Sequence, residues 1–114
     1  HLGGGSDSPV ESLSPIWGIH TAVNRMDKSE NPKGGWHPNE KLSVQEAVSL
    51  YTEDVSYLSF EEERKGKLAP GYLADFVVLS ENIFFLPPER IKEIQIEMTV
   101  VGGRIRYLNQ QPPH

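Results

Sequence analysis

Cysteine is absent from these 114 residues, which excludes disulfide bonds and thiolate metal ligands within the chain. Long apolar runs are missing too. The longest, such as Phe76–Leu79, are far too short to cross a bilayer. No basic region followed by an apolar stretch opens the chain, so no signal peptide is expected. These absences fit a reducing compartment, and we expect a cytoplasmic protein with no membrane partner.

An excess of basic residues is also lacking. Eleven basic residues stand against 16 acidic ones, which gives a formal net charge of −5 and an isoelectric point near 5.3. Binding to a phosphate backbone needs clustered Lys and Arg, so nucleic acid is not expected as a partner. Hydrophobic residues make up 37% of the chain, which allows only a small core. The length suits one small domain or a piece of a larger one.

The first half of the chain carries helical patterns. Ser14 is placed as an N-cap and Pro15 as the first helical residue. Residues of one stripe then recur at helical spacing, the apolar Ile16, Ile19, Val23 and Met26 together with His20. Turn residues follow, and they predict a surface loop over residues 27–39.

A second helical stretch is predicted from Ser43 onward. Ser43 and Glu46 form a capping-box pattern, in which each side chain can bond the other residue's backbone N–H. The helical pattern continues to residue 58, with a restart near Thr52. The charged segment Glu61–Lys67 that follows is expected to be a solvated linker.

The second half predicts a small sheet, so the fold class expected for the chain is α+β. Residues 74–79 are nearly all apolar and predict a strand buried on both faces. Residues 94–101 alternate as in a half-buried strand, and Gly102-Gly103 predicts a hairpin turn into a strand at 104–108. Residues 109–114 are expected to form a frayed tail. Three strands with exposed edges need a further surface, either from elsewhere in a longer protein or from a second copy of the chain.

Asp7 is the first candidate for chemistry. It follows Gly3-Gly4-Gly5-Ser6, a segment that permits close backbone approach and unusual φ angles. A carboxylate on such a turn can accept a proton or bind a divalent cation. The alternative is an ordinary turn or capping residue before Pro9.

The four histidines lie at His1, His20, His37 and His114, and none has the spacing of a metal-binding pair. His20 lies on the apolar stripe of the first helix and is expected to be packed. His37 follows Trp36 in a glycine-rich loop, where it is either exposed or in contact with a ligand. Trp17 and Trp36 are expected to pack or to line a pocket.

Several segments, taken in order, resemble the amidohydrolase superfamily. The stretch Ala69–Leu79, preceded by Lys65–Leu68, resembles the segment that returns the chain from the barrel to a small β-sandwich. Glu40–Ala47 with Tyr51-Thr52 resembles the helical stretch just upstream of it. Val100–Gly103 with Tyr107 resembles the closing hairpin. Asp54-Val55-Ser56 departs from the pattern, because small apolar residues are more usual there.

Gly5–Val10 (Gly-Ser-Asp-Ser-Pro-Val) resembles the end of the eighth barrel strand in one branch of that superfamily. The branch is the one represented by YtcJ-like and N-substituted formamide deformylase enzymes. The resemblance covers about residues 3–108. It implies that residues 1–65 are the end of the last strand and the following helices of a (β/α)8 TIM barrel. Residues 66–114 would then form the C-terminal part of a β-sandwich domain.

The resemblance also implies a role for Asp7. In the family the matching aspartate contacts a divalent metal, expected here to be Zn²⁺, and takes a proton from the metal-bound water. The family's metal-binding histidines, including a His-x-His pair, are not in this chain. We therefore expect a C-terminal fragment of a metal-dependent hydrolase of amide or related C–N bonds in small molecules. It would be inactive without the rest of the barrel. The alternative is a non-catalytic structural or interaction module derived from the same sandwich.

Overall fold

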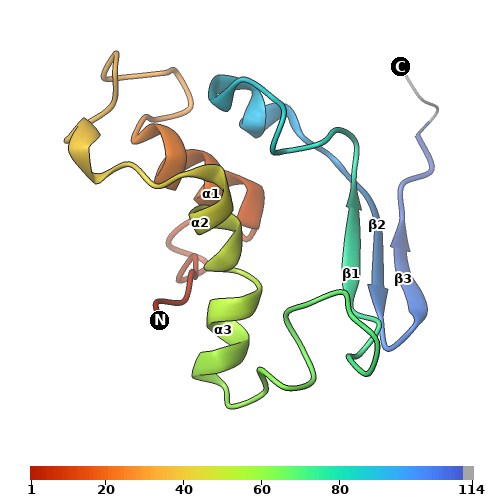
Figure 1. The fold of residues 1–114 in the computed structure, drawn as a ribbon. Helices are drawn as coiled ribbons and strands as arrows, with labels where there is room; N and C mark the ends of the chain where they lie inside the picture. Colours follow the sequence, from red (N-terminus) through yellow and green to blue (C-terminus); the bar gives the residue numbers. More distant parts are fainter. Residues whose placement is uncertain (112–114) are drawn as a thin grey trace.

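The computed structural model describes residues 1–111 and shows a small α+β arrangement, as predicted. The predicted tail lies outside the described residues from position 112 on, and His114 with it. In Figure 1 the helices occupy one side of the molecule and the sheet the other. In chain order the elements are α1 (Pro15–Asn24), η1 (Pro38–Glu40), α2 (Val44–Ser49), α3 (Glu53–Leu58), β1 (Phe76–Leu79), η2 (Pro88–Glu93), β2 (Ile96–Val101) and β3 (Arg104–Leu108).

The helix boundaries follow local signals in the sequence. α1 starts at Pro15, and Ser14 occupies the N-cap position although its side chain makes no capping bond. The predicted capping box of α2 is confirmed. Ser43 Oγ accepts the N–H of Glu46 at 3.1 Å, and the Glu46 carboxylate accepts the N–H of Ser43 at 2.8 Å. The restart near Thr52 is also confirmed, since Thr52 is the N-cap residue of α3.

The core lies between α1, α2 and the segment that contains η2. η2 is a 3-10 helix that packs against α1, and its Ile91 is completely buried. The sequence patterns predict no element there. The buried apolar residues of this core are Ile16, Ile19, Val23, Ala47, Ile83, Ile91 and Ile94.

The three strands form an antiparallel sheet in the order β1-β2-β3. Val77 of β1 lies opposite Thr99 of β2, and Thr99 in turn lies opposite Tyr107 of β3. The predicted hairpin turn is confirmed. Gly102 and Gly103 both have positive φ, 58° and 74°, which glycine adopts without a steric penalty.

The predicted burial of β1 on both faces is wrong, since Val77 is 51% exposed and Val78 39% exposed. The reason is that the core lies between helices and η2, so within residues 1–111 little covers the centre of the sheet. β2 is also shorter than predicted and begins at Ile96, because Ile94 ends η2 instead of pairing in the sheet. Of its alternating apolar residues, only Val100 is buried.

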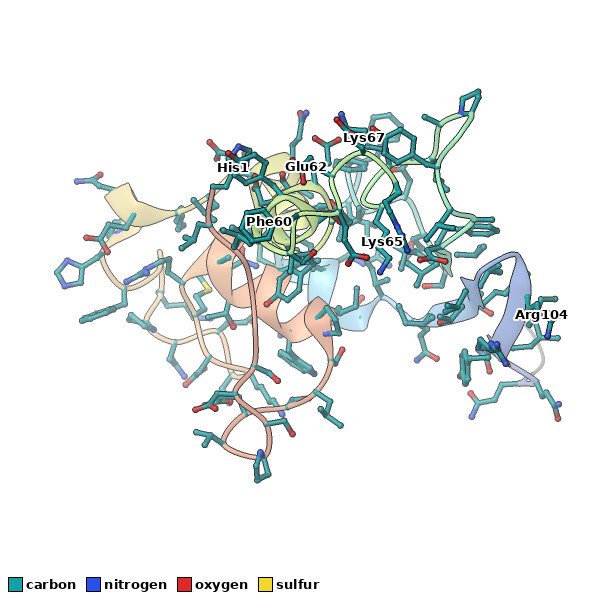
Figure 2. All side chains as sticks on the ribbon, turned by 90° about the horizontal axis from the view of Figure 1, so that it is seen from below. His1, Phe60, Glu62, Lys65, Lys67 and Arg104 are labelled. Carbon is teal, nitrogen blue, oxygen red and sulfur yellow. The ribbon has the colours of Figure 1, made fainter. Side chains whose placement is uncertain are left out.

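The charged segment Glu61–Lys67 is more ordered than a solvated linker. Lys65 Nζ lies 2.9 Å from a carboxylate oxygen of Glu61, and both side chains are half-buried. Gly66 lies close to α3, where a Cβ would come within 2.8 Å of Ser56 Oγ. Glycine permits this approach. Lys65, Lys67 and the exposed Glu62 are labelled in Figure 2.

Among residues 1–111, no helix has both the length and the hydropathy needed to cross a membrane.

Candidate functional site

Asp7 occupies the first position of a turn. Its backbone has a positive φ of 51°, and its carbonyl oxygen accepts the N–H of Val10 at 2.9 Å. Aspartate is one of the few residues that tolerate this left-handed conformation. The side chain is exposed. The turn role predicted from the sequence is therefore present, and the carboxylate remains accessible to a ligand.

Two of the glycines before Asp7, Gly3 and Gly4, lie close to α2, α3 and the turn between these helices. They form no strand, although the sequence suggests the end of one there. The N–H of Gly4 donates to the carbonyl of Leu50 at 2.9 Å. A Cβ on Gly4 would come within 2.6 Å of the Tyr51 ring, and one on Gly3 within 2.9 Å of Leu58 Cδ1. A side chain at either position would have to displace Tyr51 or Leu58, so glycine permits the close approach that the sequence predicts.

His1 is held against α3 by two contacts. Its Nδ1 lies 2.8 Å from Asp54 Oδ1, and its ring stacks on Tyr57 with 3.8 Å between the centroids. Figure 2 shows His1 beside α3, with Arg104 at the far edge of the molecule. Asp54 also accepts a hydrogen bond from Ser49 Oγ at 2.8 Å. The polar residue at position 54 thus makes specific bonds at the turn between α2 and α3.

A surface hollow of about 1130 Å³ runs along the glycine segment. Trp17, Trp36 and Tyr51 line it together with residues 3–6. Of the two alternatives for the tryptophans, packing or lining a pocket, the second therefore fits their positions. His37 is not among the lining residues. It is exposed, and its ring meets the Trp36 ring edge-on with centroids 4.3 Å apart.

Two cations lie over the tryptophans of this hollow. The Arg25 guanidinium is 5.2 Å from the Trp36 ring centroid, and Lys28 Nζ is 4.7 Å from that of Trp17. Arg25 is further fixed by the Trp36 carbonyl, which accepts from its Nε at 2.7 Å, and by Glu40 at 3.4 Å. Each cation is attracted to the negative face of its ring. Two aromatic rings paired with cations therefore form part of the lining of the hollow.

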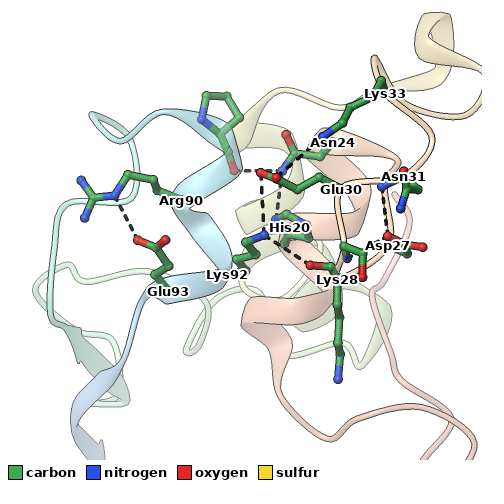
Figure 3. A network of polar contacts seen from close by, with 12 residues as sticks. His20, Asn24, Asp27, Lys28, Glu30, Asn31, Lys33, Arg90, Lys92 and Glu93 are labelled. Atoms are coloured by element: carbon green, nitrogen blue, oxygen red, sulfur yellow. Dashed lines mark hydrogen bonds and ion pairs between the residues drawn. The ribbon is translucent and has the colours of Figure 1, made fainter.

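His20 is buried, as predicted, with 1% of its surface exposed. Burial lowers its pKa, and the positive charge of Lys92 lowers the pKa further. The carbonyl of Asp27 and the carboxylates of Glu30 and Glu89 act in the opposite direction. Nε2 of His20 has no hydrogen-bond partner among residues 1–111. Figure 3 shows this side chain inside a polar network between α1 and η2.

A complete metal site is not present in the part of the chain that the structure describes. Among residues 1–111, no group of three His, Asp or Glu side chains is placed to hold a metal ion. His1 and His20 are engaged with Asp54 and Asn24, and His37 lies against Trp36. Residues 1–111 therefore offer single donors, of which Asp7 is an accessible one.

Comparison with known proteins identifies the class of this chain. The model of the Amidohydrolase family matches residues 1–107. The chain therefore belongs to the amidohydrolase family, as the sequence motifs predict. No solved structure gives a significant match.

Three relatives illustrate the match. The chain is 40% identical over 104 residues to YtcJ of Bacillus subtilis, an amidohydrolase by name, covering 91% of this chain and 20% of that protein. It is 35% identical over 105 residues to Protein LONG AFTER FAR-RED 3 of Arabidopsis thaliana, covering 90% and 17%. It is 28% identical over 102 residues to N-substituted formamide deformylase of Arthrobacter pascens, covering 90% and 18%. The chain thus spans about a fifth of the length of these relatives.

Proposed function

We propose that the complete protein hydrolyses an amide or related C–N bond in a small molecule, and that this chain contributes Asp7 to its active site. The family membership supports the reaction class, and the name of one relative describes the removal of a formyl group from N-substituted formamides. The observation that carries the proposal is the geometry of Asp7. Its exposed carboxylate follows a glycine segment held on α2 and α3.

In this proposal Asp7 binds a divalent metal and accepts a proton during hydrolysis. The described residues fit one part of such a site, because they supply an accessible carboxylate but no group of three donors. The other ligands would come from the rest of the protein. Zinc is the metal we expect, and a bound zinc ion supplies Lewis acidity and a water of lowered pKa.

We further propose that the chain joins two structural units. Residues 1–65 would complete the end of a (β/α)8 barrel, and residues 66–114 would form part of a β-sandwich. This division is supported by the order of elements, with α1–α3 before residue 65 and the three strands after it. It is also supported by the exposed centre of β1 and by β3, whose residues are all exposed. Such surfaces are suited to contact with other parts of a longer protein.

A second candidate function is a structural or interaction module without catalysis. The lack of a three-donor metal group among residues 1–111 favours it for the chain alone. Calorimetric titration with zinc separates the two roles. We expect the 114-residue chain to show no stoichiometric, tight zinc site, and the complete protein to show one. A tight site in the chain alone would contradict the division of ligands proposed here.

The reaction class is tested by screening the complete protein against N-acyl and N-formyl compounds. We expect hydrolysis of at least one of these classes and its loss when a chelator removes the metal, followed by recovery when zinc is restored. Carboxylate esters of matching shape serve as the control substrates. A protein that binds metal but hydrolyses none of the C–N compounds would contradict the proposal.

A further inference from the structure

Tyr51 touches both the segment that carries Asp7 and the helix that follows it. Three atoms of its ring, Cζ, Cε1 and Cε2, lie between 2.6 and 2.9 Å from the place that a Cβ on Gly4 would occupy. A Cβ on Gly18 of α1 would overlap the hydroxyl of the same Tyr51 side chain. The ring therefore fills the space between Gly4 and Gly18, and neither position can carry a side chain without moving it.

The backbone next to Tyr51 holds the same glycine. The carbonyl of Leu50 accepts the N–H of Gly4 at 2.9 Å. Tyr51 itself is half-buried and packs against the core formed by α1, α2 and the η2 segment. Gly4 is thus fixed by one hydrogen bond and one ring contact, both from neighbouring residues that the core supports.

Asp7 follows Gly4 by three residues, a length of chain that spans at most about 10 Å. A Cβ on the intervening Gly5 would meet nothing within 4 Å. Gly4 is therefore the last glycine of the segment in close contact with the helices. Only Gly5 and Ser6 separate Asp7 from this closely packed position.

We propose that Tyr51 is a positioning residue for Asp7, acting through the packing of its ring against Gly4. This inference rests on the proposed function of Asp7. The volume and placement of the ring carry the effect, because the contacts with Gly4 are made by ring carbons. It also gives a reason for glycine at two separated positions, Gly4 and Gly18, which both lie against the hydroxyl end of one side chain.

The test uses the complete protein with Tyr51→Phe, Tyr51→Leu and the control Tyr107→Leu, the same change on β3. We expect Tyr51→Leu to lower kcat by about 100-fold with little change in KM, since a misplacement of roughly 1 Å has that effect on catalysis. Tyr51→Phe and Tyr107→Leu should stay within about twofold of the parent. Hydrogen exchange followed by mass spectrometry should show faster exchange in a peptide covering residues 1–10 only for Tyr51→Leu.

A double variant separates this inference from the function on which it rests. If Tyr51 acts through Asp7, Tyr51→Leu should cause no further loss of kcat in an Asp7→Asn background. An additive loss in the double variant would overturn the inference. An unchanged kcat in Tyr51→Leu would also overturn it when Asp7→Asn lowers the rate as expected. Retained activity in Asp7→Asn contradicts the proposed function instead. In that case the exchange data decide, and unchanged protection of residues 1–10 in Tyr51→Leu overturns the positioning role.

Two smaller substitutions, Gly18→Ala and Tyr51→Phe, test the same contact if Tyr51→Leu does not fold. Gly18→Ala alone should displace the Tyr51 ring and lower kcat. Tyr51→Phe removes the hydroxyl that the new Cβ would overlap, so the same Gly18→Ala change should cost less in the Tyr51→Phe background. Equal losses in the two backgrounds would contradict the contact on which the inference is built.

Discussion

Nδ2 of Asn24 lies 3.0 Å from Nδ1 of His20, one turn earlier on α1, and 2.8 Å from the carbonyl oxygen of Pro88 in η2. A carbonyl only accepts, so the Asn24 atom that faces it must be the NH2 group, which also donates to His20. Nδ1 of His20 is therefore an acceptor, and the neutral imidazole carries its proton on Nε2. Figure 3 shows this pair between α1 and η2.

The neutral state of His20 predicts a dependence of stability on pH. Its pKa in the folded state is lowered from the ordinary value of 6.5, so the unfolded chain binds the proton more readily. Stability is then complete above about pH 6.5 and falls as the pH drops from there through the lowered pKa. The fall is at most about 1.4 kcal/mol per pH unit for one proton. Hydrogen exchange of the α1 amides at several pH values measures it.

His20→Leu should remove most of this pH dependence, whatever it does to stability at neutral pH. His37→Gln is the control, because His37 is exposed and should leave the dependence in place. The account of His20 is wrong if the α1 amides of the parent protein are equally protected at pH 5 and pH 7.

Asn24→Ala should destabilise the contact between α1 and η2. The change leaves the buried Nδ1 of His20 without its donor, which costs about 1–3 kcal/mol, and it also removes the partly buried bond to the Pro88 carbonyl. Urea unfolding measures the loss as a lower midpoint. Asn39→Ala, at an exposed asparagine in η1, should change the midpoint little, and equal losses from the two variants would contradict this reading.

Ser43→Ala should weaken the start of α2. The variant removes the oxygen that accepts the N–H of Glu46, and loss of such an N-cap costs about 0.5–2 kcal/mol. The change is measured by chemical denaturation, with the exposed Ser29→Ala as control. A Ser43→Ala protein as stable as the parent would show that the capping box contributes nothing in this setting.

Two glycines with nearly the same backbone angle provide a matched comparison. Gly66 has φ 90° and Gly71 has φ 92°. A Cβ on Gly71 would meet nothing within 4 Å. A Cβ on Gly66 would meet Ser56 Oγ at 2.8 Å and the Thr52 carbonyl oxygen at 3.0 Å. Alanine should strain the backbone at both positions by roughly 1–2 kcal/mol. Gly66→Ala should lose more stability than Gly71→Ala in thermal unfolding. The reverse order would contradict the packing of this segment on α3.

The elements that the sequence predicts correctly depend on neighbouring residues. Ser43 and Glu46 form their box within one helical turn, and Gly102-Gly103 makes the hairpin because both residues have positive φ. The parts that the sequence does not predict depend on distant ones. Ile91 is buried by α1, far earlier in the chain, and no local pattern encodes that contact. The exposure of Val77 likewise depends on which layers surround the sheet, and a run of apolar residues does not indicate which layers are present.

The candidate site divides in the same way. The turn at Asp7 follows from Gly-Ser-Asp-Ser-Pro, since these residues favour turns and positive φ. The burial of His20 follows from the apolar stripe of α1. The contact between the Tyr51 ring and Gly4 could not be predicted. A run of glycines indicates that something packs closely there, but it does not indicate which side chain. The role of Asp7 in catalysis stays a prediction.

The most direct test of the central claim is the kcat/KM of the complete, metal-loaded protein with Asp7→Asn, measured on whichever amide or formamide the screen identifies. The control is Glu62→Gln, at an exposed carboxylate in the segment after α3. If Asp7 binds the metal and accepts the proton, its loss should lower kcat/KM by about 10²–10⁴, while the control keeps the parent value. An Asp7→Asn protein that keeps the parent kcat/KM would show that Asp7 neither binds the metal nor accepts the proton.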